Sequence, residues 1–324
     1  MIKYSPINIK TWSLTGANGC IGIAALEVAK ENEKSIFMTA DQGTYSGLMR
    51  FKNAYPDRFF NAGISEQNMI TVAGGLAKEG FNPFVTAQAP FMSMRCTDQV
   101  RVTLGYMKLG VKILGLSAGF SQGEYGATHH CINDIAIMRS IPNLTVLSPA
   151  DCTETVKIIM SLANSDLPVY VRLTGITHNP IVYSEDFDFE IGKSISLKEG
   201  KDITIFATGT MVYQSLKAAE ILSERGIEAK VVDMHTIKPL DVEAVKEACQ
   251  AKLIVTVEEG SVIGGLGGAV AEILATRTKK TPPLCIIGAE DTYIHADEYP
   301  RLLENSGLTA PQIAEKITEA YKNL

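Results

Sequence analysis

Short β-branched, apolar runs alternate with longer segments of helical period along most of this 324-residue chain, and this alternation constrains the fold more than any other feature. Strands are predicted at Ser35–Thr39, Phe84–Ala87, Lys112–Leu116, Leu144–Leu147 and Val169–Arg172, and again at Asp202–Phe206, Ala229–Val232, Leu253–Val257 and Leu284–Ile287. Helices are predicted between them at Gln67–Lys78, Ile132–Arg139, Met211–Arg225, Val242–Cys249 and Leu266–Ala275. Strands and helices that alternate at this spacing form parallel sheets covered by helices on both faces. The sequence therefore predicts an α/β fold.

A break in this rhythm at Asn179–Gly192 predicts that the chain forms two domains. The segment reads NPIVYSEDFDFEIG, which is polar and aromatic and has no helical period. Segments of this kind are typical of domain linkers. We expect a first domain over residues 1–182, a linker over 183–194 and a second domain over 195–324, each with a largely parallel sheet flanked by helices.

The charge balance and the cysteines limit the function classes. A net charge of −6 and a pI near 5.5 argue against nucleic acid or an anionic membrane as the main partner. No apolar run approaches the roughly 20 residues that span a bilayer, and the start of the sequence does not resemble a signal peptide. The six cysteines are scattered without metal-ligand spacing. We expect a cytoplasmic protein with reduced thiols, no metal ligands of its own, and small-molecule substrates.

The glycine-rich segment Gly260–Ala269 (GSVIGGLGGA) follows the predicted strand Leu253–Val257 and invites comparison with dinucleotide-binding loops. It lacks the third glycine of that fingerprint at the right place, so we interpret it as a tight strand-to-helix turn. No GxxxxGK[ST] phosphate-binding loop occurs in the sequence. The chain therefore carries no recognisable phosphate cradle of its own.

Two other segments carry candidate catalytic side chains. In GISEQNM, Glu66 lies at the start of the predicted helix Gln67–Lys78. A carboxylate there either is stabilised by the helix dipole or faces a ligand at the carboxyl edge of a parallel sheet. In GEYGATHH, His129 and His130 lie in a glycine-bounded loop. These histidines could be catalytic, metal-binding or merely solvated, and spacing alone does not decide among these roles.

Together with three further motifs, these segments resemble the transketolase family of thiamine-diphosphate enzymes, specifically the C-terminal half of its members. The matching stretches are Gly63–Met69 (GISEQNM), Phe91–Arg101 (FMSMRCTDQVR), Gly126–Asn143 (GATHHCINDIAIMRSIPN), Met234–Leu240 (MHTIKPL) and Val257–Gly267 (VEEGSVIGGLG). Their order and spacing hold from about Ser35 to the C-terminus. The resemblance implies a pyrimidine-binding domain followed by a transketolase C-terminal domain.

The sequence lacks the family's diphosphate-binding motif. That motif is Gly-Asp-Gly followed later by an Asn that completes a magnesium site, and no GDG occurs here. The resemblance therefore implies one subunit of a split transketolase, with the N-terminal, diphosphate-binding subunit on a separate polypeptide. We expect that partner to hold the diphosphate and Mg²⁺ of the cofactor thiamine diphosphate, and the two chains to form an α2β2 heterotetramer.

The resemblance also implies roles for individual residues. Thiamine must lose a proton from its thiazolium carbon, and its aminopyrimidine can serve as the base once a carboxyl group bonded to the ring nitrogen favours the imino form. Glu66 matches the family glutamate that does this, and Phe91 matches an aromatic residue that packs on the pyrimidine ring. Asp41 matches an acid near the thiazolium. His129 matches a residue that lines the cofactor and donor-hydroxyl side of the pocket, and we assign it a catalytic role beside Glu66.

Other positions depart from the family pattern. Arg95, in FMSMRCTDQVR, completes the implied cofactor-binding set, in which Gln88 replaces a phenylalanine. The implied substrate pocket differs from the family at five positions. This chain has Gly175 and, approximately, Asn18 where the family has arginines, Tyr45 where it has a serine, a residue near Ser117 where it has a histidine, and Tyr125 where it has an aspartate. Each lost Arg–phosphate contact removes ~1.5–3 kcal/mol of binding free energy. We expect an acceptor or donor that differs from the standard sugar phosphates, and Gly175→Arg to recover part of the deficit if the pocket backbone is otherwise preserved.

Three functional hypotheses remain. The leading one is a transketolase-like subunit that transfers a two-carbon ketol unit from a ketose-like donor to an aldehyde acceptor. The second is a subunit of a 2-oxoacid-using relative, similar to a dehydrogenase E1 β chain or to deoxyxylulose-phosphate synthase. The third is a non-catalytic paralogue: the retained Glu66, Phe91 and His129 argue against it, while the changes at Gly175, Tyr125 and Gln88 keep it open.

Overall fold

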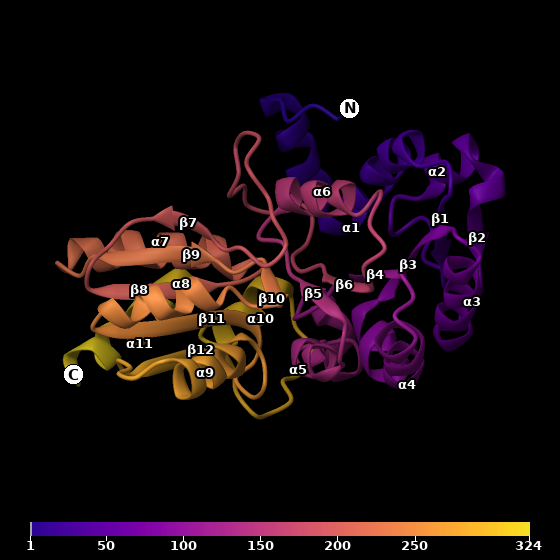
Figure 1. The fold of residues 1–324 in the computed structure, drawn as a ribbon. Coiled ribbons are helices and arrows are strands. Elements are labelled where there is room, and N and C mark those ends of the chain that lie inside the picture. The colour runs from indigo at the N-terminus through magenta and orange to yellow at the C-terminus, as the bar shows by residue number, and fades with distance from the viewer. Residues whose placement is uncertain (1) are drawn as a thin grey trace.

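The predicted strands assemble into two separate sheets in this computed structural model, which describes residues 2–324 (Figure 1). The first sheet has seven strands in the order β10-β5-β6-β4-β3-β1-β2, and the second has five in the order β12-β11-β8-β9-β7. The strands of the first are β1 (Ser35–Thr39), β2 (Phe59–Asn61), β3 (Asn82–Gln88), β4 (Lys112–Leu116), β5 (Thr145–Leu147), β6 (Val169–Arg172) and β10 (Thr236–Lys238). Those of the second are β7 (Ile195–Lys198), β8 (Ile203–Ala207), β9 (Ala229–Asp233), β11 (Leu253–Ser261) and β12 (Leu284–Ala289).

Both sheets are parallel except at one edge strand each, which confirms the predicted fold class. The exceptions are β10, antiparallel to β5, and β7, antiparallel to β9. Helices cover both faces: α1 (Pro6–Glu31), α2 (Met49–Ala54), α3 (Glu66–Lys78), α4 (Thr97–Val100), α5 (Asp134–Ser140), α6 (Cys152–Ser161), α7 (Met211–Glu224), α8 (Val242–Glu247), α9 (Leu266–Arg277), α10 (Tyr299–Asn305) and α11 (Ala310–Lys322). Short 3₁₀ turns lie at Pro56–Arg58, Gly123–Thr128 and Ala248–Gln250, and π-helical turns lie at Phe91–Arg95 and Arg101–Tyr106, on either side of α4.

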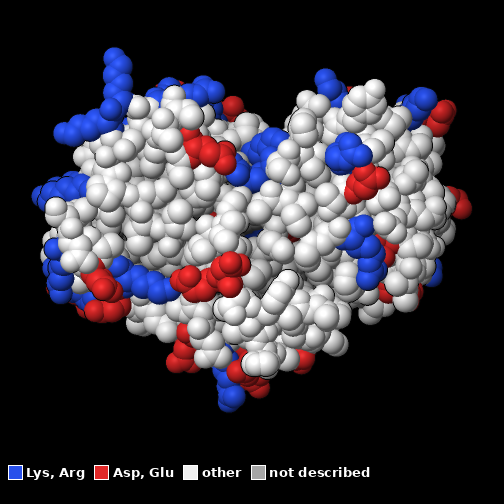
Figure 2. All heavy atoms as spheres, turned by 90° about the horizontal axis from the view of Figure 1, so that it is seen from below, with Lys and Arg blue, Asp and Glu red and all other residues white. Residues whose placement is uncertain are grey.

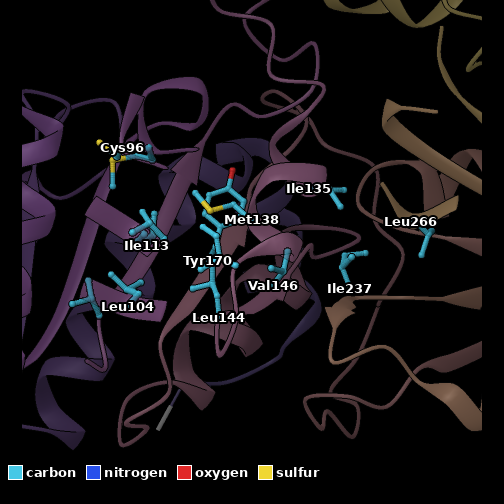
Figure 3. Packing of buried hydrophobic residues seen from close by; sticks show 14 of the residues in the cluster. Cys96, Leu104, Ile113, Ile135, Met138, Leu144, Val146, Tyr170, Ile237 and Leu266 are labelled. Carbon is cyan, nitrogen blue, oxygen red and sulfur yellow. The ribbon is translucent and has the colours of Figure 1, made fainter. Parts of the chain in front are cut away.

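The first sheet separates two hydrophobic cores because alternate side chains of a strand point to opposite faces. Phe37 and Phe84 lie in one core, with the apolar residues of α1 and α6. Met38 and Val85 lie in the other, with those of α3 and α5. This second core continues into the second domain, where Ile237 takes part in the same cluster (Figure 3). The two domains therefore share buried apolar surface.

The strand β10 shows how closely the two halves of the chain are joined. Thr236 and Lys238 pair with Leu147 and Val146 of the first sheet, although β10 follows strands of the second sheet in the sequence. The Lys238 ammonium donates hydrogen bonds to the backbone carbonyls of Arg139 (3.0 Å) and Ile141. The lysine thus satisfies carbonyl groups at the end of α5 that the helix itself leaves free.

The distribution of charged side chains and the state of the cysteines bear on the expectations drawn from the composition. Figure 2 shows positive and negative side chains interspersed on one face, without a continuous basic stripe. Within residues 2–324, no helix is long and apolar enough to cross a membrane. All six cysteines are free thiols, and four of them are buried.

Candidate active site

Four of the candidate site residues lie at the carboxyl edge of the first sheet. Asp41 follows β1, Gln88 ends β3, Ser117 follows β4, and Gly175 follows β6. Because these strands are parallel, their carboxyl ends meet at one edge, which is where α/β proteins bind ligands. The topology of the sheet therefore brings together residues that are up to 134 positions apart in the sequence.

Glu66 is the buried carboxylate of this edge. It is the first residue of α3 and is 3% exposed. Its Oε2 accepts a hydrogen bond of 2.9 Å from Nη1 of Arg95, while no residue of the described chain donates a hydrogen bond to Oε1. The Arg95 guanidinium also lies over the ring of Phe91, with its Cζ 4.0 Å from the ring centroid. Three residues with predicted roles in cofactor binding are thus in direct contact.

An aromatic row extends from Phe91 across the site. The ring of His129 meets Phe91 edge-on at 5.4 Å and lies 5.0 Å from the ring of Tyr125. Nδ1 of His129 is 3.0 Å from the Thr128 hydroxyl, which leaves Nε2 without a partner in the described residues. His129 therefore has one ring nitrogen free for a ligand.

The neighbouring His130 has a different role, which the sequence left undecided. It is 6% exposed, and its Nε2 is 3.1 Å from the carbonyl oxygen of Gly123. Its ring packs edge-on against Phe120 at 5.4 Å. His130 therefore closes the base of the loop that presents His129, and it does not face the site.

Asp41 is held in place by a reciprocal pair of hydrogen bonds with Asn61. The Asn61 amide donates to Oδ1 of Asp41 (3.1 Å), and the Asp41 backbone N–H donates to Oδ1 of Asn61 (3.0 Å). Asp41 has a φ of 59°, in the left-handed region that aspartate tolerates better than most residues. The carboxylate is exposed at the sheet edge and remains available to a ligand.

Gln88 has an unsatisfied polar atom. The residue is 9% exposed, and its Oε1 is buried without a hydrogen-bond donor in the described chain. A buried amide oxygen without a partner costs about 1–3 kcal/mol of stability. The site therefore contains a polar group that a bound molecule could satisfy.

Four of the predicted substrate residues line a cavity of about 920 Å³, whereas His129 and Ser117 are not among the described residues that line it. Its walls include Asn18, Tyr45, Tyr125 and Gly175. Ser117 lies behind the wall and joins two of them: the Asn18 amide donates to the Ser117 hydroxyl (2.8 Å), and the Tyr45 hydroxyl is 2.8 Å from the same oxygen. Asn18 and Ser117 are therefore in contact beside the cavity, although neither lies in a strong motif, and their role in substrate binding stays a prediction.

Gly175 has a backbone conformation that disfavours a larger side chain. Its φ is +86°, and a Cβ atom there would lie 2.9 Å from both side-chain polar atoms of Asn179 and from Cγ2 of Thr210. Both features disfavour any larger residue. We therefore expect the Gly175→Arg substitution to strain the backbone at this position, which limits the recovery that it can give.

Gln122 and Arg50 are cavity residues that the motif comparison did not single out. Gln122 donates a hydrogen bond of 2.5 Å to the Tyr45 hydroxyl and so extends the polar row Asn18–Ser117–Tyr45. Arg50 is the only lysine or arginine among the described residues that line the cavity. The position of Gln122 directly before the glycine-bounded loop was the one feature of the sequence that could have pointed to it. No feature of the sequence pointed to Arg50.

The segment VEEGSVIGGLG builds the junction between the domains. Glu258 accepts a hydrogen bond from the backbone of Gly267 (3.0 Å) and packs so closely on Gly265 that a Cβ there would lie 2.0 Å from its Oε2. The interpretation of Gly260–Ala269 as a strand-to-helix turn is therefore confirmed, with β11 ending at Ser261 and α9 beginning at Leu266.

Comparison with known proteins agrees with this architecture. Residues 19–177 match the model of the transketolase pyrimidine binding domain, and residues 192–313 match that of the transketolase C-terminal domain. A putative transketolase C-terminal section from Methanocaldococcus jannaschii is 42% identical over 93% of this chain and 95% of its own length. The chain belongs to the transketolase family.

Within this family, the chain is similar to separately encoded C-terminal subunits. One of the subunits of the apulose-4-phosphate transketolase of Phocaeicola vulgatus is 38% identical over 92% of this chain and 95% of its own length. The 6-deoxy-6-sulfo-D-fructose transketolase subunit of a Clostridium species is 39% identical over 91% of this chain and 92% of its own length. A solved split-gene transketolase, described as an inactive β4 tetramer, is 39% identical with a TM-score of 0.85, over 95% of this chain and 98% of its own.

Longer family members contain a matching half. The 1-deoxy-D-xylulose-5-phosphate synthase of Caldanaerobacter subterraneus is 35% identical over 99% of this chain, which spans 52% of that enzyme. The chain also superimposes on 46% of the transketolase from Campylobacter jejuni with a TM-score of 0.78, and at 21% identity this shows a common fold. The chain therefore corresponds to one half of these longer transketolase-family enzymes.

The residues at the sheet edge fit the thiamine cofactor of this family. Glu66 offers a buried carboxylate with one oxygen free of protein donors, Phe91 offers a partly exposed ring, and Gln88 offers a buried acceptor without a donor. Burial, with the Glu66 carboxylate second, raises the pKa of the Cys96 thiol to about 12, so this neighbour of Arg95 stays protonated and uncharged.

Proposed function

We propose that the protein is the C-terminal subunit of a split, thiamine-diphosphate-dependent transketolase that transfers a two-carbon ketol unit from a ketose-like donor to an aldehyde acceptor. The observation that carries this proposal is the contact set of Glu66, Phe91 and His129 at the carboxyl edge of the first sheet. Family membership and the similarity to separately encoded subunits support it.

Each residue of the site has a task in this reaction. The bound cofactor supplies a carbon nucleophile that stabilises the two-carbon unit. The Glu66 carboxyl would share a proton with the pyrimidine ring nitrogen, and its burial would keep water from competing. Phe91 would pack against the pyrimidine ring, and the buried Gln88 amide oxygen would accept a hydrogen bond from the cofactor. Asp41 would lie near the thiazolium, and His129 would hold the donor hydroxyl.

We assign the cofactor's diphosphate and Mg²⁺ mainly to an N-terminal subunit. The absence of a GDG motif from the sequence and the names of the similar subunits support a partner polypeptide. An α2β2 heterotetramer would place each cofactor between a pyrimidine domain and a diphosphate domain. A cytoplasmic location is part of the same proposal, and the six free thiols support it.

We further propose that the substrate is not a standard sugar phosphate. The two positions matched to family arginines hold Asn18 and Gly175, and Gly175 disfavours a larger side chain, so Arg50 is the one cation among the described residues that line the cavity. Two lost Arg–phosphate contacts at ~1.5–3 kcal/mol each weaken transition-state binding of a sugar phosphate by roughly 10²–10⁴-fold. The substrates in the names of the two similar subunits, apulose 4-phosphate and 6-deoxy-6-sulfo-D-fructose, support a non-standard substrate.

A 2-oxoacid-using enzyme is the second candidate function. The 35% identity to 1-deoxy-D-xylulose-5-phosphate synthase favours it, because that chain shares the same two domains with this one. A non-catalytic paralogue is the third, and the presence of Glu66, Phe91 and His129 together at the sheet edge argues against a decayed site.

Reconstitution tests the first part of the proposal. The chain alone should bind no thiamine diphosphate at micromolar concentrations, whereas the complex with its partner should bind it with Mg²⁺ and run as a heterotetramer in size-exclusion chromatography with light scattering. A screen of ketose and 2-oxoacid donors with this complex then separates the two enzyme classes. Tight cofactor binding by the purified chain alone would contradict the split-subunit assignment.

The substrate proposal is tested by kcat/KM of the complex on xylulose 5-phosphate with ribose 5-phosphate, compared with non-phosphorylated and otherwise charged aldehydes. We expect the phosphate pair to be the poorer substrates by roughly 10²–10⁴-fold. A kcat/KM of about 10⁴ M⁻¹s⁻¹ or more for the phosphate pair, the size found in ordinary enzymes, would show that the phosphate grip survives.

A further inference from the structure

Arg95 reaches away from its own helical turn into the candidate cofactor site. Its Nη1 donates a hydrogen bond of 2.9 Å to Oε2 of Glu66, and its Cζ lies 4.0 Å from the centroid of the Phe91 ring. The guanidinium therefore occupies the space between a buried carboxylate and an aromatic face.

The two groups that Arg95 contacts, the Glu66 carboxylate and the Phe91 ring, are the ones that the proposed function assigns to the pyrimidine ring of the cofactor. The ring would pack on Phe91 and hydrogen-bond with Glu66. A guanidinium is planar, carries N–H donors in its plane and stacks on aromatic faces, so it satisfies both partners at once. The edge of His129 approaches Phe91 at 5.4 Å from another direction, which restricts the ring surface that remains. Two planar groups cannot fill the same space, so entry of a ring requires Arg95 to leave.

The two partners of this ion pair differ in how freely they can move. The Arg95 side chain is 44% exposed, whereas the Glu66 side chain is 4% exposed. The described residues give the Arg95 side chain no hydrogen bond other than the one to Glu66, and its backbone is tied separately, since Gln67 donates to the Arg95 carbonyl (3.2 Å). Arg95 can therefore swing into solvent without unpacking the core, while Glu66 stays in place.

We propose that the Arg95 guanidinium is a placeholder for the pyrimidine ring, which occupies its position in the cofactor-free chain and is displaced when the cofactor docks. The inference rests on the proposed function and reverses the role expected for Arg95: the residue competes with the cofactor instead of binding it. While the guanidinium is in place, it keeps Glu66 and Phe91 paired and the site filled.

The free energy needed to displace Arg95 determines how much its removal changes the affinity for the cofactor. A partly exposed ion pair and a cation–π contact together correspond to roughly a 3- to 30-fold factor in an equilibrium constant. A site that is open only part of the time binds its ligand more weakly by the fraction of time it is open. Removing the guanidinium should therefore tighten cofactor binding by about 3- to 30-fold.

The test measures binding by titration calorimetry on the complex with the N-terminal subunit, in the presence of Mg²⁺. Arg95→Gln removes the charge and the stacking plane, and Arg95→Lys keeps an ion pair with Glu66 but loses the plane. Arg101→Gln is the matched control, because Arg101 lies on the same helical segment and pairs with exposed Asp98. Each complex is titrated with thiamine diphosphate and, separately, with inorganic pyrophosphate, which needs no pyrimidine site.

The proposal expects Arg95→Gln to lower the Kd of thiamine diphosphate by about 3- to 30-fold, Arg95→Lys to lower it less, and Arg101→Gln to leave it unchanged. The Kd of pyrophosphate should be the same in all complexes. An unchanged or weaker affinity of Arg95→Gln for thiamine diphosphate, in a complex whose wild type binds it, overturns the placeholder and leaves the proposed function standing. Failure of the assembled wild type to bind the cofactor at all overturns both.

Discussion

The protein contains two arginine–carboxylate pairs in very different surroundings, one at the candidate site and one at the domain junction. At the junction, Arg172 and Asp134 are both completely buried, and Nε of Arg172 donates to both carboxylate oxygens at 3.0 and 2.9 Å. At the site, Glu66 is buried but Arg95 is 44% exposed and makes one hydrogen bond. The arginine at the junction is therefore held in place by burial, whereas the arginine at the site can leave its carboxylate.

Further hydrogen bonds hold the junction, although Nη1 of Arg172 has no partner among the described residues. Arg172 donates through Nη2 to the carbonyl of Glu259 (2.6 Å), and the Glu259 carboxylate accepts hydrogen bonds from the Phe120 backbone (2.7 Å), Thr210 (2.5 Å) and Tyr299 (2.8 Å). Burial raises the pKa of Glu259 above its usual range, while Arg172 opposes this rise. These carboxylates hold elements of both domains together and present no free oxygen to a ligand.

The comparison shows that burial of an acid does not by itself identify a catalytic group. Glu66, Asp134 and Glu259 are all buried, but only Glu66 lies at the carboxyl edge of the sheet with an oxygen that no described residue uses. A group that must exchange partners during a reaction needs an incomplete set of protein partners. The Asp134 and Glu259 carboxylates at the junction, by contrast, have a donor on each oxygen.

The largest effect should follow from Glu66→Gln in the assembled enzyme. The amide keeps the shape of the side chain but removes the proton that the carboxyl shares with the cofactor. Turnover should fall by roughly 10²–10⁴-fold, the usual range for a general acid–base group. The free energy of unfolding should change little, because the partner Arg95 is half exposed.

Glu79→Gln is the matched control for this substitution. Glu79 caps the other end of α3 and is exposed, so its loss should leave turnover and stability unchanged. Wild-type turnover in Glu66→Gln with the cognate substrate would contradict the role proposed for Glu66. A large drop in unfolding free energy would instead place Glu66 with the acids of the junction.

The next effect concerns the junction. Arg172→Met leaves Asp134 buried without its cation, and breaking a buried pair in this way costs about 3–5 kcal/mol. Urea unfolding of the full chain should show this loss. Arg139→Met is the control: Arg139 also joins the domains, but its partner Glu272 is 66% exposed, so the loss should stay below about 1 kcal/mol. Similar losses in both variants would remove the distinction between the buried and the exposed pair.

Much of the fold could be predicted because the central strands are buried on both faces. Strands such as Ser35–Thr39 and Val169–Arg172 are apolar runs with sharp ends, and the structure places them at the same residues. The strand β10 was missed because it is three residues long, partly polar, and paired with a distant part of the chain. Helix α1 was missed because its apolar residues do not follow a helical stripe and Gly16 interrupts it with a φ of 80°.

The candidate site was predictable where motifs cover it and less so elsewhere. The position of Glu66 at a helix start on the sheet edge followed from the sequence, and the resemblance supplied its expected role. The contact of Glu66 with Arg95 could not be predicted, because it joins residues 29 positions apart through side-chain conformations. The restriction on side chains at Gly175 could not be predicted either, since it depends on the neighbouring Asn179 and Thr210.

A second buried acid cluster sharpens the comparison further. Asp151, Glu154 and Asp233 lie together between the domains, with Tyr183 donating a hydrogen bond of 2.7 Å to Oδ2 of Asp233. Glu154 Oε1 and Asp233 Oδ1 have no donor among the described residues although their carboxyl groups are neighbours, so a shared proton is the arrangement that satisfies both. Burial raises the pKa of Asp233 to about 7, and burial and the nearby acids raise that of Glu154.

This cluster makes the stability of the protein depend on pH. The unfolded chain loses the Asp233 proton near its ordinary pKa of 3.8, whereas the folded chain keeps it up to about pH 7. Between these values the folded state binds more protons, so rising pH lowers the unfolding free energy by up to about 1.4 kcal/mol per pH unit for this group. Above about pH 7 the folded state also releases the proton, and the contribution levels off.

Asp233→Asn tests this expectation, because the amide keeps the size of the protonated acid and cannot ionise. Urea unfolding from pH 5 to pH 8 should show the variant close to wild type at pH 5 and more stable at pH 8, by an amount on the order of 2–4 kcal/mol. Asp202→Asn is the control, since Asp202 has a lowered pKa from its hydrogen bonds with Lys252 and the Glu228 backbone, and its loss should destabilise the protein at both values. If Asp233→Asn were instead less stable than wild type at pH 8, the ionised acid would be the native form, and this cluster would resemble the Arg172 junction in needing its charge.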